Sequence, residues 1–350
     1  MIFRDLEYVI GKSYGLKGKL LPYTMLEELA SSKNLEELVE KLRPTDYGPY
    51  VASLPRPLNP TRIELALRRC LVEVHFDLAM KSKNAGIIQA YFMKYLTSNL
   101  KTILKGKALG KSYEELLELV DLRAEELVKR RDIVVRTMAA KDLAEAVRFL
   151  SGTKFSDVAS MAMEVYEKEK DLVVFDMAMD KAYFSEVLKE FNKLRFAERK
   201  RVREIVAVDI DGYTILAIMR SKLWGLTIAE TKRLLLDKAV NIPSDTIDRM
   251  VEAGNVTDAL RILDETPYKS IIPESSAPDT SIIKALEEAF ERLTLKRASE
   301  AFLKDIFSVS VPIALLKLKE FEVRNISIIA AGIEEGLSVS KMLQRVVKLQ

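Results

Sequence analysis

Apolar residues recur along most of this chain at the spacing that places them on one face of a helix. Between positions 62 and 80 they are Leu65, Leu67, Leu71, Val74 and Leu78. Later in the chain the same period links Leu286, Phe290 and Leu293, and then Ile326, Ile329, Ala330 and Ile333. This period predicts helices with a buried stripe. The predicted helices cover residues 5–19, 23–31, 34–42, 62–80, 87–105, 112–129, 133–150, 156–170, 172–193, 199–222, 255–264, 280–293, 297–308, 312–333 and the segment from 338 onward.

Residues that break helices are scarce. The chain has 13 glycines and 11 prolines in 350 residues, about half of the usual share of roughly 12%. No proline lies between Pro60 and Pro243. A sheet protein of this length would need many more turn residues, so the sequence predicts an all-α fold.

Two short patterns occur three times, about 110 residues apart. In the first pattern a glycine follows a polar residue by eleven positions and a hydroxyl residue follows it by thirteen. Its copies are Asn99, Gly110 and Ser112, then Thr214, Gly225 and Thr227, then Asn325, Gly336 and Ser338. The second pattern is Leu42, Thr45 and Tyr47, then Leu150, Thr153 and Phe155, then Leu263, Thr266 and Tyr268. Because both patterns recur with nearly the same spacing, they predict three similar helical bundles. The predicted repeat units are 1–111, 112–226 and 227–350.

The first glycine copy resembles a phosphate-binding loop, Gly106-Lys-Ala-Leu-Gly110-Lys111-Ser112. Such a loop needs four residues between its glycines and a buried strand before it. Here three residues intervene, and the preceding segment has a helical pattern. The other copies lack the lysine, so the shared role is a helix stop followed by an N-cap. Capping boxes are expected in the first two copies, whereas Lys341 replaces the glutamate in the third.

Composition excludes several other functions. The net charge of +3 gives no strong case for nucleic-acid binding. One cysteine, Cys70, and one histidine, His75, cannot assemble a zinc site. We therefore expect no catalytic residue, no cofactor and no metal. The N-terminal segment lacks the apolar core of a signal peptide, and no segment reaches the length of a membrane span.

Two charged groups need an interpretation. Asp209 and Asp211 precede Thr214 at the offsets at which Glu320 and Glu322 precede Asn325. Acid pairs can bind a divalent ion or transfer protons, but ion pairs with basic residues of neighbouring helices are favoured here. The densest basic run could dock an acidic partner or the surface of a membrane complex, or could be a solvated helix junction. It contains Lys193, Arg195, Arg199, Lys200, Arg201 and Arg203.

The third copy carries a family resemblance. The segment FSVSVPIALLKLKEFEVRNISIIAAGIEEGLS at 307–338 resembles the C subunit of archaeal and bacterial V-type (A-type) ATP synthases, whose eukaryotic counterpart is the d subunit. The segments YVIGKSYGLKGKLL, NLEELVEKLRPTDY and DIDGYTILAIMRSKLWGL fit the same family, although Thr214 stands where an asparagine is expected. The residues that carry the match are Glu320, Glu322, Arg324, Asn325, Ile329 and Gly336.

The resemblance implies three bundles around a pseudo-threefold axis, shaped like a funnel. It implies a non-catalytic rotor part of the central stalk, a socket that couples the axle to the membrane proteolipid ring during ATP synthesis or hydrolysis and proton or sodium transport. Its partners would be the axle subunits and the ring, with a stator subunit as a further candidate. The chain would then lie peripherally at the cytoplasmic face of the cell membrane. The alternative is a helical-repeat adaptor for soluble partners.

Overall fold

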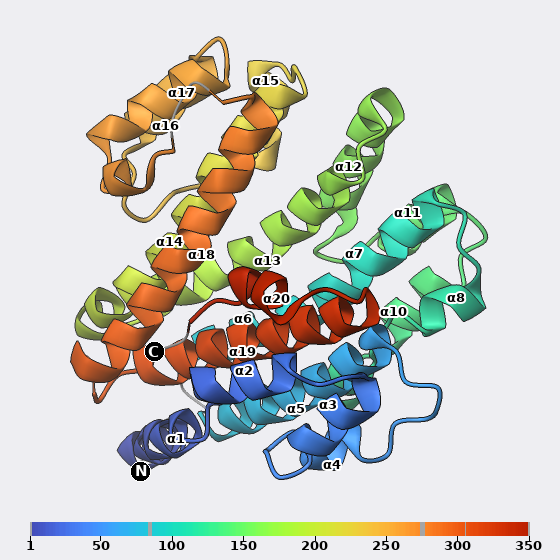
Figure 1. The fold of residues 1–350 in the computed structure, drawn as a ribbon. Coiled ribbons are helices and arrows are strands. Elements are labelled where there is room, and N and C mark those ends of the chain that lie inside the picture. Colours follow the sequence, from blue (N-terminus) through green and yellow to red (C-terminus); the bar gives the residue numbers. More distant parts are fainter. Residues whose placement is uncertain (1, 83–85, 274–276, 305, 349–350) are drawn as a thin grey trace. The chain divides into compact units, whose positions relative to one another are not determined.

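The computed structural model describes residues 2–82, 86–273, 277–304 and 306–348 (Figure 1). Within these residues the chain forms helices and turns and no strand, which confirms the predicted all-α class. The chain divides into two compact units. Unit 1 comprises residues 1–92, 121–130 and 297–350, and unit 2 comprises 93–120 and 131–296. Unit 1 therefore combines most of the first sequence copy and the end of the third with a ten-residue segment of the second.

Unit 1 is built around its penultimate helix, α19 (Ser310–Glu334). This helix contacts α1, α2, α3, α5 and α20, so that in Figure 1 the red α19 lies among the blue helices of the N-terminal segment. Apolar residues lie on every side of α19, and Ile313, Leu316, Ile326 and Ile329 are buried. The surrounding elements are α1 (Ile2–Lys17), α2 (Tyr23–Ala30), α3 (Leu35–Leu42), α4 (Gly48–Val51), α5 (Pro60–Lys81), α6 (Gly86–Phe92), α9 (Arg123–Leu127) and α20 (Val339–Arg345).

Unit 2 contains the other helices, with α13 (Val173–Lys193) packed against α7, α12 and α14. The long helix α14 (Phe196–Leu223) also contacts α15 and α17. The other elements of unit 2 are α7 (Lys94–Ala108), α8 (Tyr113–Leu117), α10 (Asp132–Met138), α11 (Leu143–Phe149), α12 (Ser156–Glu169), α15 (Ile228–Leu234), α16 (Ser244–Glu252), α17 (Val256–Ile262), and the 3₁₀ turns η1 (Leu263–Glu265) and η2 (Lys269–Ile271). Helix α18 (Asp279–Lys304) begins in unit 2, which ends at Lys296.

The three repeat glycines end their helices in the same way. Gly110, Gly225 and Gly336 have φ values of +74°, +62° and +67°. In each copy the glycine N–H and the next N–H donate back to carbonyls of the last turn, as Gly110 does to Lys107 and Lys111 to Gly106. This left-handed ending closes orphan carbonyls, and glycine adopts it without steric cost.

A hydroxyl N-cap follows each of these glycines. Ser112 and Thr227 form complete capping boxes with Glu115 and Glu230, which confirms the prediction for both. Ser338 accepts a hydrogen bond from the backbone N–H of Lys341, and that copy has the cap without the reciprocal glutamate bond.

Several helix predictions were wrong in extent. The segment 87–105 forms α6 and α7, and 133–150 forms α10 and α11, instead of one helix each. The segment 112–129 forms α8 and α9 instead of one helix, and the carboxylate of Asp121 accepts from the backbone N–H of Arg123 where the second helix starts. The two helices predicted at 280–293 and 297–308 are replaced by the single helix α18, which has no break between them and ends at Lys304. No glycine or proline lies between Asp279 and Lys304, so nothing local stops that helix.

Candidate functional site: buried acid–tyrosine contacts and exposed helix ends

The Leu-Thr-Tyr pattern forms one kind of turn in all three copies. The hydroxyl of Thr45 donates to the carbonyl of Leu42 at 2.6 Å and accepts from the backbone N–H of Tyr47 at 3.2 Å. The same two bonds occur at Thr153 and at Thr266. A threonine hydroxyl that bonds its own backbone in this way replaces a helical hydrogen bond and reverses the chain. The pattern therefore fixes where the aromatic residue enters the core.

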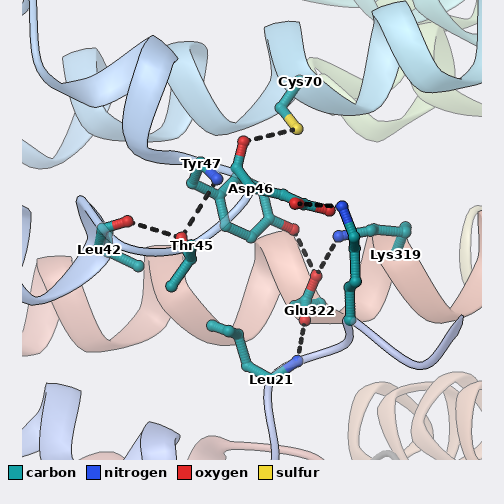
Figure 2. A network of polar contacts seen from close by, with 9 residues as sticks. Leu21, Leu42, Thr45, Asp46, Tyr47, Cys70, Lys319 and Glu322 are labelled. Atoms are coloured by element: carbon teal, nitrogen blue, oxygen red, sulfur yellow. Dashed lines mark hydrogen bonds and ion pairs between the residues drawn. The ribbon is translucent and has the colours of Figure 1, made fainter. Parts of the chain in front are cut away.

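In unit 1 the aromatic residue of this turn reaches an acid on α19. Figure 2 shows that the hydroxyl of Tyr47 donates to Glu322 at 2.6 Å and that the backbone N–H of Leu21 donates to the other carboxylate oxygen. Lys319 forms an ion pair with Glu322 at 2.9 Å, although its side chain is only 1% exposed. Burial and the Glu322 charge raise the pKa of Tyr47 well above its usual range. The tyrosine therefore remains a hydrogen-bond donor.

Unit 2 contains an equivalent contact between Tyr268 and α14. The hydroxyl of Tyr268 donates to Asp211 at 2.7 Å, and the backbone N–H groups of Val240 and Asn241 donate to the same carboxylate at 2.6 and 2.9 Å. Asp211 is completely buried. Burial raises the pKa of Asp211, and the three hydrogen bonds oppose that rise. In unit 2 neutral donors alone, two backbone N–H groups and a phenol, stabilise the buried carboxylate. In unit 1 the ammonium group of Lys319 also contributes.

One tyrosine position and one acid position are apolar instead. Phe155, in the second copy, occupies the tyrosine position and is buried, and Leu96, in the first copy, occupies the acid position. The three copies thus contain two tyrosines and two acids at these positions, and each tyrosine contacts the acid of a different copy. Sequence reasoning noted each pattern and missed this pairing. The favoured interpretation of ion pairs with neighbouring helices was wrong for Glu322, whose cation lies on its own helix, and for Asp211, whose donors are backbone N–H groups and a phenol.

The polar repeat residues Asn99, Thr214 and Asn325 are all buried. Asn325 donates to the carbonyl of Val347 and accepts from its N–H, at 2.7 and 3.0 Å, so it holds the segment after α20 against α19. Thr214 donates to the carbonyl of Ile210 one turn earlier in α14. The two side chains have different partners at equivalent positions.

The basic run lies at the turn between α13 and α14. Arg203 donates to Asn241 and to the carbonyl of Val240, Arg199 donates to the carbonyl of Asn192, and Arg201 pairs weakly with Glu198 at 3.9 Å. The side chains of Arg195 and Lys200 are exposed, and neither forms a hydrogen bond or an ion pair with any residue that the structure describes. Two of the six basic residues in this run are therefore available for another molecule.

Exposed apolar residues gather at both ends of the long helices. Tyr113, Ile228 and Val339 directly follow the three repeat N-caps, and all three are exposed. At the other end, Phe196 begins α14 and is 76% exposed, and Phe307 precedes α19 and is 71% exposed. Helices of 28 and 25 residues extend about 40 Å. Each of α14 and α19 therefore separates two exposed apolar positions by about that distance.

The described residues contain no cluster of three or more histidine, cysteine, aspartate or glutamate side chains that could hold a metal. At the phosphate-loop candidate the helical α7 precedes Gly110, and Lys111 lies 3.5 Å from Glu115. His75 is buried and lies 3.0 Å from the carbonyl of Ile88, and burial raises the pKa of the Cys70 thiol to about 11. None of the described helices combines the length and apolar character of a membrane span.

These features define an all-helical protein in which the distinctive polar side chains hold helices together. A family model for the ATP synthase (C/AC39) subunit matches residues 9–345, and the chain belongs to that family. It is 26% identical to the C subunit of the A-type ATP synthase of Methanocaldococcus jannaschii, over 98% of this chain and 86% of the relative. The same-named proteins of Pyrococcus abyssi and Pyrococcus horikoshii are each 27% identical, over 95% and 93% of this chain and 88% and 86% of their own lengths.

Proposed function

We propose that this chain is a non-catalytic rotor part of an A-type ATP synthase, a socket that couples the central axle to the membrane proteolipid ring. Its relatives are named as the C subunit of that synthase. In this function the chain transmits torque between ion transport, of protons or sodium, and ATP synthesis or hydrolysis. It would act at the cytoplasmic face of the cell membrane.

The observation that carries the proposal is the exposure of apolar residues at both ends of the same long helices. Phe196 and Ile228 flank α14, and Phe307 and Val339 flank α19. Exposed large apolar side chains in equivalent positions mark surfaces that a partner covers. A coupling part needs two such surfaces, one for each partner, and stiff elements between them.

The buried contacts supply that stiffness. Asp211 and Glu322 lie near the midpoints of α14 and α19, and each carboxylate accepts several hydrogen bonds from segments packed alongside. A buried polar network that is fully satisfied holds one geometry, because any shift leaves a charged group without a partner. Twisting either helix relative to its neighbours therefore meets a steep cost.

The basic turn suggests which end faces the membrane. Residues 193–203 contain six basic residues and one acidic residue, whereas the whole chain has a net charge of only +3. Cytoplasmic membrane surfaces carry negative potential. We assign the α13–α14 turn to the ring side, and we assign the exposed apolar residues after the three repeat N-caps, Tyr113, Ile228 and Val339, to axle contacts of their own units.

A pull-down from membranes solubilised with detergent tests the assignment. The tagged chain should recover axle and ring subunits. The triple variant Tyr113→Ser, Ile228→Ser and Val339→Ser should lose the axle and keep the ring. Val128→Ser, another exposed apolar position, is the matched control and should keep both. Recovery of no synthase subunit by the unaltered chain would refute the function.

The three-bundle, pseudo-threefold funnel is also part of this proposal, since a socket must close around an axle. Small-angle scattering of the isolated chain distinguishes it from the open solenoid of a helical-repeat adaptor. A compact particle with a maximum dimension near that of one long helix plus its caps would support the funnel. A curved rod would favour the adaptor.

A further inference from the structure

The α13–α14 turn has an unusual combination of exposed side chains. Phe196 is 76% exposed and lies between Arg195 and the charged residues of the first turns of α14. Large aromatic side chains are seldom left in water at such a position unless another phase or molecule receives them. Lys193, Arg195 and Lys200 are exposed as well. The result is one apolar ring within a group of cations.

The cations at this turn are only partly neutralised within the protein. Lys193 pairs with Glu190 at 2.6 Å, and Arg199 and Arg203 are tied to backbone carbonyls. Arg195 and Lys200 make no such contact among the described residues. One guanidinium group and one ammonium group therefore flank Phe196 with their hydrogen-bonding capacity free.

The equivalent turn of α18 and α19 lacks these cations. Phe307 is exposed there, but the neighbouring Lys304 is paired with Glu300 at 3.1 Å, and Glu300 also pairs with Arg297. Both turns thus expose an aromatic residue, but among the described residues of these two turns only the α13–α14 turn has basic side chains without a partner. The charge is not a general property of the repeat.

We propose that the α13–α14 turn binds the headgroups of anionic lipids, with Phe196 inserted at the level of the ester or ether groups and Arg195 and Lys200 bound to phosphates. Aromatic rings prefer the interface between water and hydrocarbon, and basic side chains beside them are attracted by anionic lipid. A flat bilayer surface accepts a projecting turn, whereas a protein partner would need a matching cavity. The position of this turn beside the membrane rests on the proposed function, and the lipid contact does not.

Co-sedimentation with vesicles tests the proposal on the whole chain. The chain should bind vesicles that contain phosphatidylglycerol and should not bind vesicles of phosphatidylcholine alone. Binding should weaken as salt is added, because screening reduces the attraction. Arg195→Gln with Lys200→Gln should weaken binding roughly 30-fold, because each basic residue near an anionic surface contributes about 1 kcal/mol to binding. Phe196→Ser should weaken it about tenfold.

The control replaces two exposed lysines of unit 2 that lie outside this turn. Lys238→Gln with Lys284→Gln gives the same net charge as the test variant, and neither lysine forms a described ion pair. This control should bind like the unaltered chain. Equal loss in both double variants would mean that only net charge matters, and it would overturn the proposal.

Pull-down of the synthase by the same variants separates this inference from the proposed function. If the chain does not bind anionic vesicles but still recovers the ring subunits, the lipid proposal is wrong and the coupling function stands. The turn would then contact protein instead of lipid. If it binds anionic vesicles through the turn and recovers no synthase subunit, the lipid site stands and the coupling function falls.

Discussion

The hydroxyl of Tyr47 donates a hydrogen bond to Glu322, a residue 275 positions later in the chain. Both side chains are buried in unit 1, where Tyr47 lies in a turn between α3 and α4 and Glu322 lies on α19. The two ends of the sequence therefore depend on each other for one folded core.

Tyr47→Phe should lower the free energy of unfolding by about 1–2 kcal/mol, because Glu322 loses one of its buried donors. Urea denaturation measures the change. The reverse substitution Phe155→Tyr should also destabilise, since the first copy has Leu96 where the other two copies have an acid, and those two acids already accept from Tyr268 and Tyr47. A buried hydroxyl without a partner costs about 1–3 kcal/mol. If Phe155→Tyr has unchanged stability, tyrosine at this turn does not require the acid.

Glu322→Leu should be more damaging, by about 3–5 kcal/mol, because it leaves the ammonium group of Lys319 buried without its counter-ion. The double variant Lys319→Met with Glu322→Leu removes both charges. The double variant should recover at least about 1 kcal/mol of that loss, because it no longer buries an unpaired ammonium group. The recovery should be incomplete, because the donors of Tyr47 and Leu21 lack their acceptor in both variants. Chemical denaturation of the three proteins forms the comparison. A double variant no more stable than Glu322→Leu would show that Lys319 reaches water.

The missing half of the third capping box offers a stabilising change. Lys341 is exposed and occupies the position of Glu115 and Glu230 in the other copies. Lys341→Glu should raise the free energy of unfolding by about 0.5–1 kcal/mol, because the carboxylate can accept from the Ser338 N–H and lies at a helix N-terminus. Lys341→Ala removes the lysine without adding an acceptor, and it should give little of this gain in thermal denaturation.

Glu230 makes stability depend on acid pH. Its pKa is lowered to about 2, first by the backbone N–H of Thr227 and then by hydrogen bonds from Lys168 and the Thr227 hydroxyl. An acid with a depressed folded pKa stabilises the fold above its unfolded pKa near 4.5, and that contribution disappears as pH falls toward 2. Glu230→Gln should cost about 1 kcal/mol at neutral pH after solvent screening. The difference in Tm from the unaltered chain should vanish near pH 2, and a constant difference at every pH would contradict this origin.

Gly225 tests the helix ending separately from packing. Its φ is +62°, and apart from Gly225 itself and its two chain neighbours no residue has an atom within 4 Å of the place where a Cβ would stand. Gly225→Val should cost roughly 1 kcal/mol or more through backbone strain alone. Gly225→Asn should cost less, since asparagine tolerates the left-handed conformation. Equal Tm values for the three proteins would show that the ending tolerates any residue.

Local chemistry explains what the sequence could predict. The glycine-hydroxyl pattern indicated the helix endings and caps because all partners lie within a few residues, as for Gly110 and Ser112. The pairing of Tyr47 with Glu322 depends on how helices from different copies pack, so only the apolar residues Phe155 and Leu96, at one tyrosine position and one acid position, hinted at it. The sequence also could not show which basic residues of the run form hydrogen bonds within the protein, since the partners of Arg203 lie 37 and 38 residues away.

The central position of α19 sets the order in which the chain can mature. A ribosome that makes roughly 5–20 residues per second reaches Glu322 between about 14 and 55 seconds after Tyr47, given their separation of 275 positions. During that interval the N-terminal helices lack the helix that fills their core, and they need a holding partner or tolerate exposure. A chain that is truncated before α19 lacks the central helix of unit 1, so only a chain that includes α19 can present a folded unit 1 for assembly.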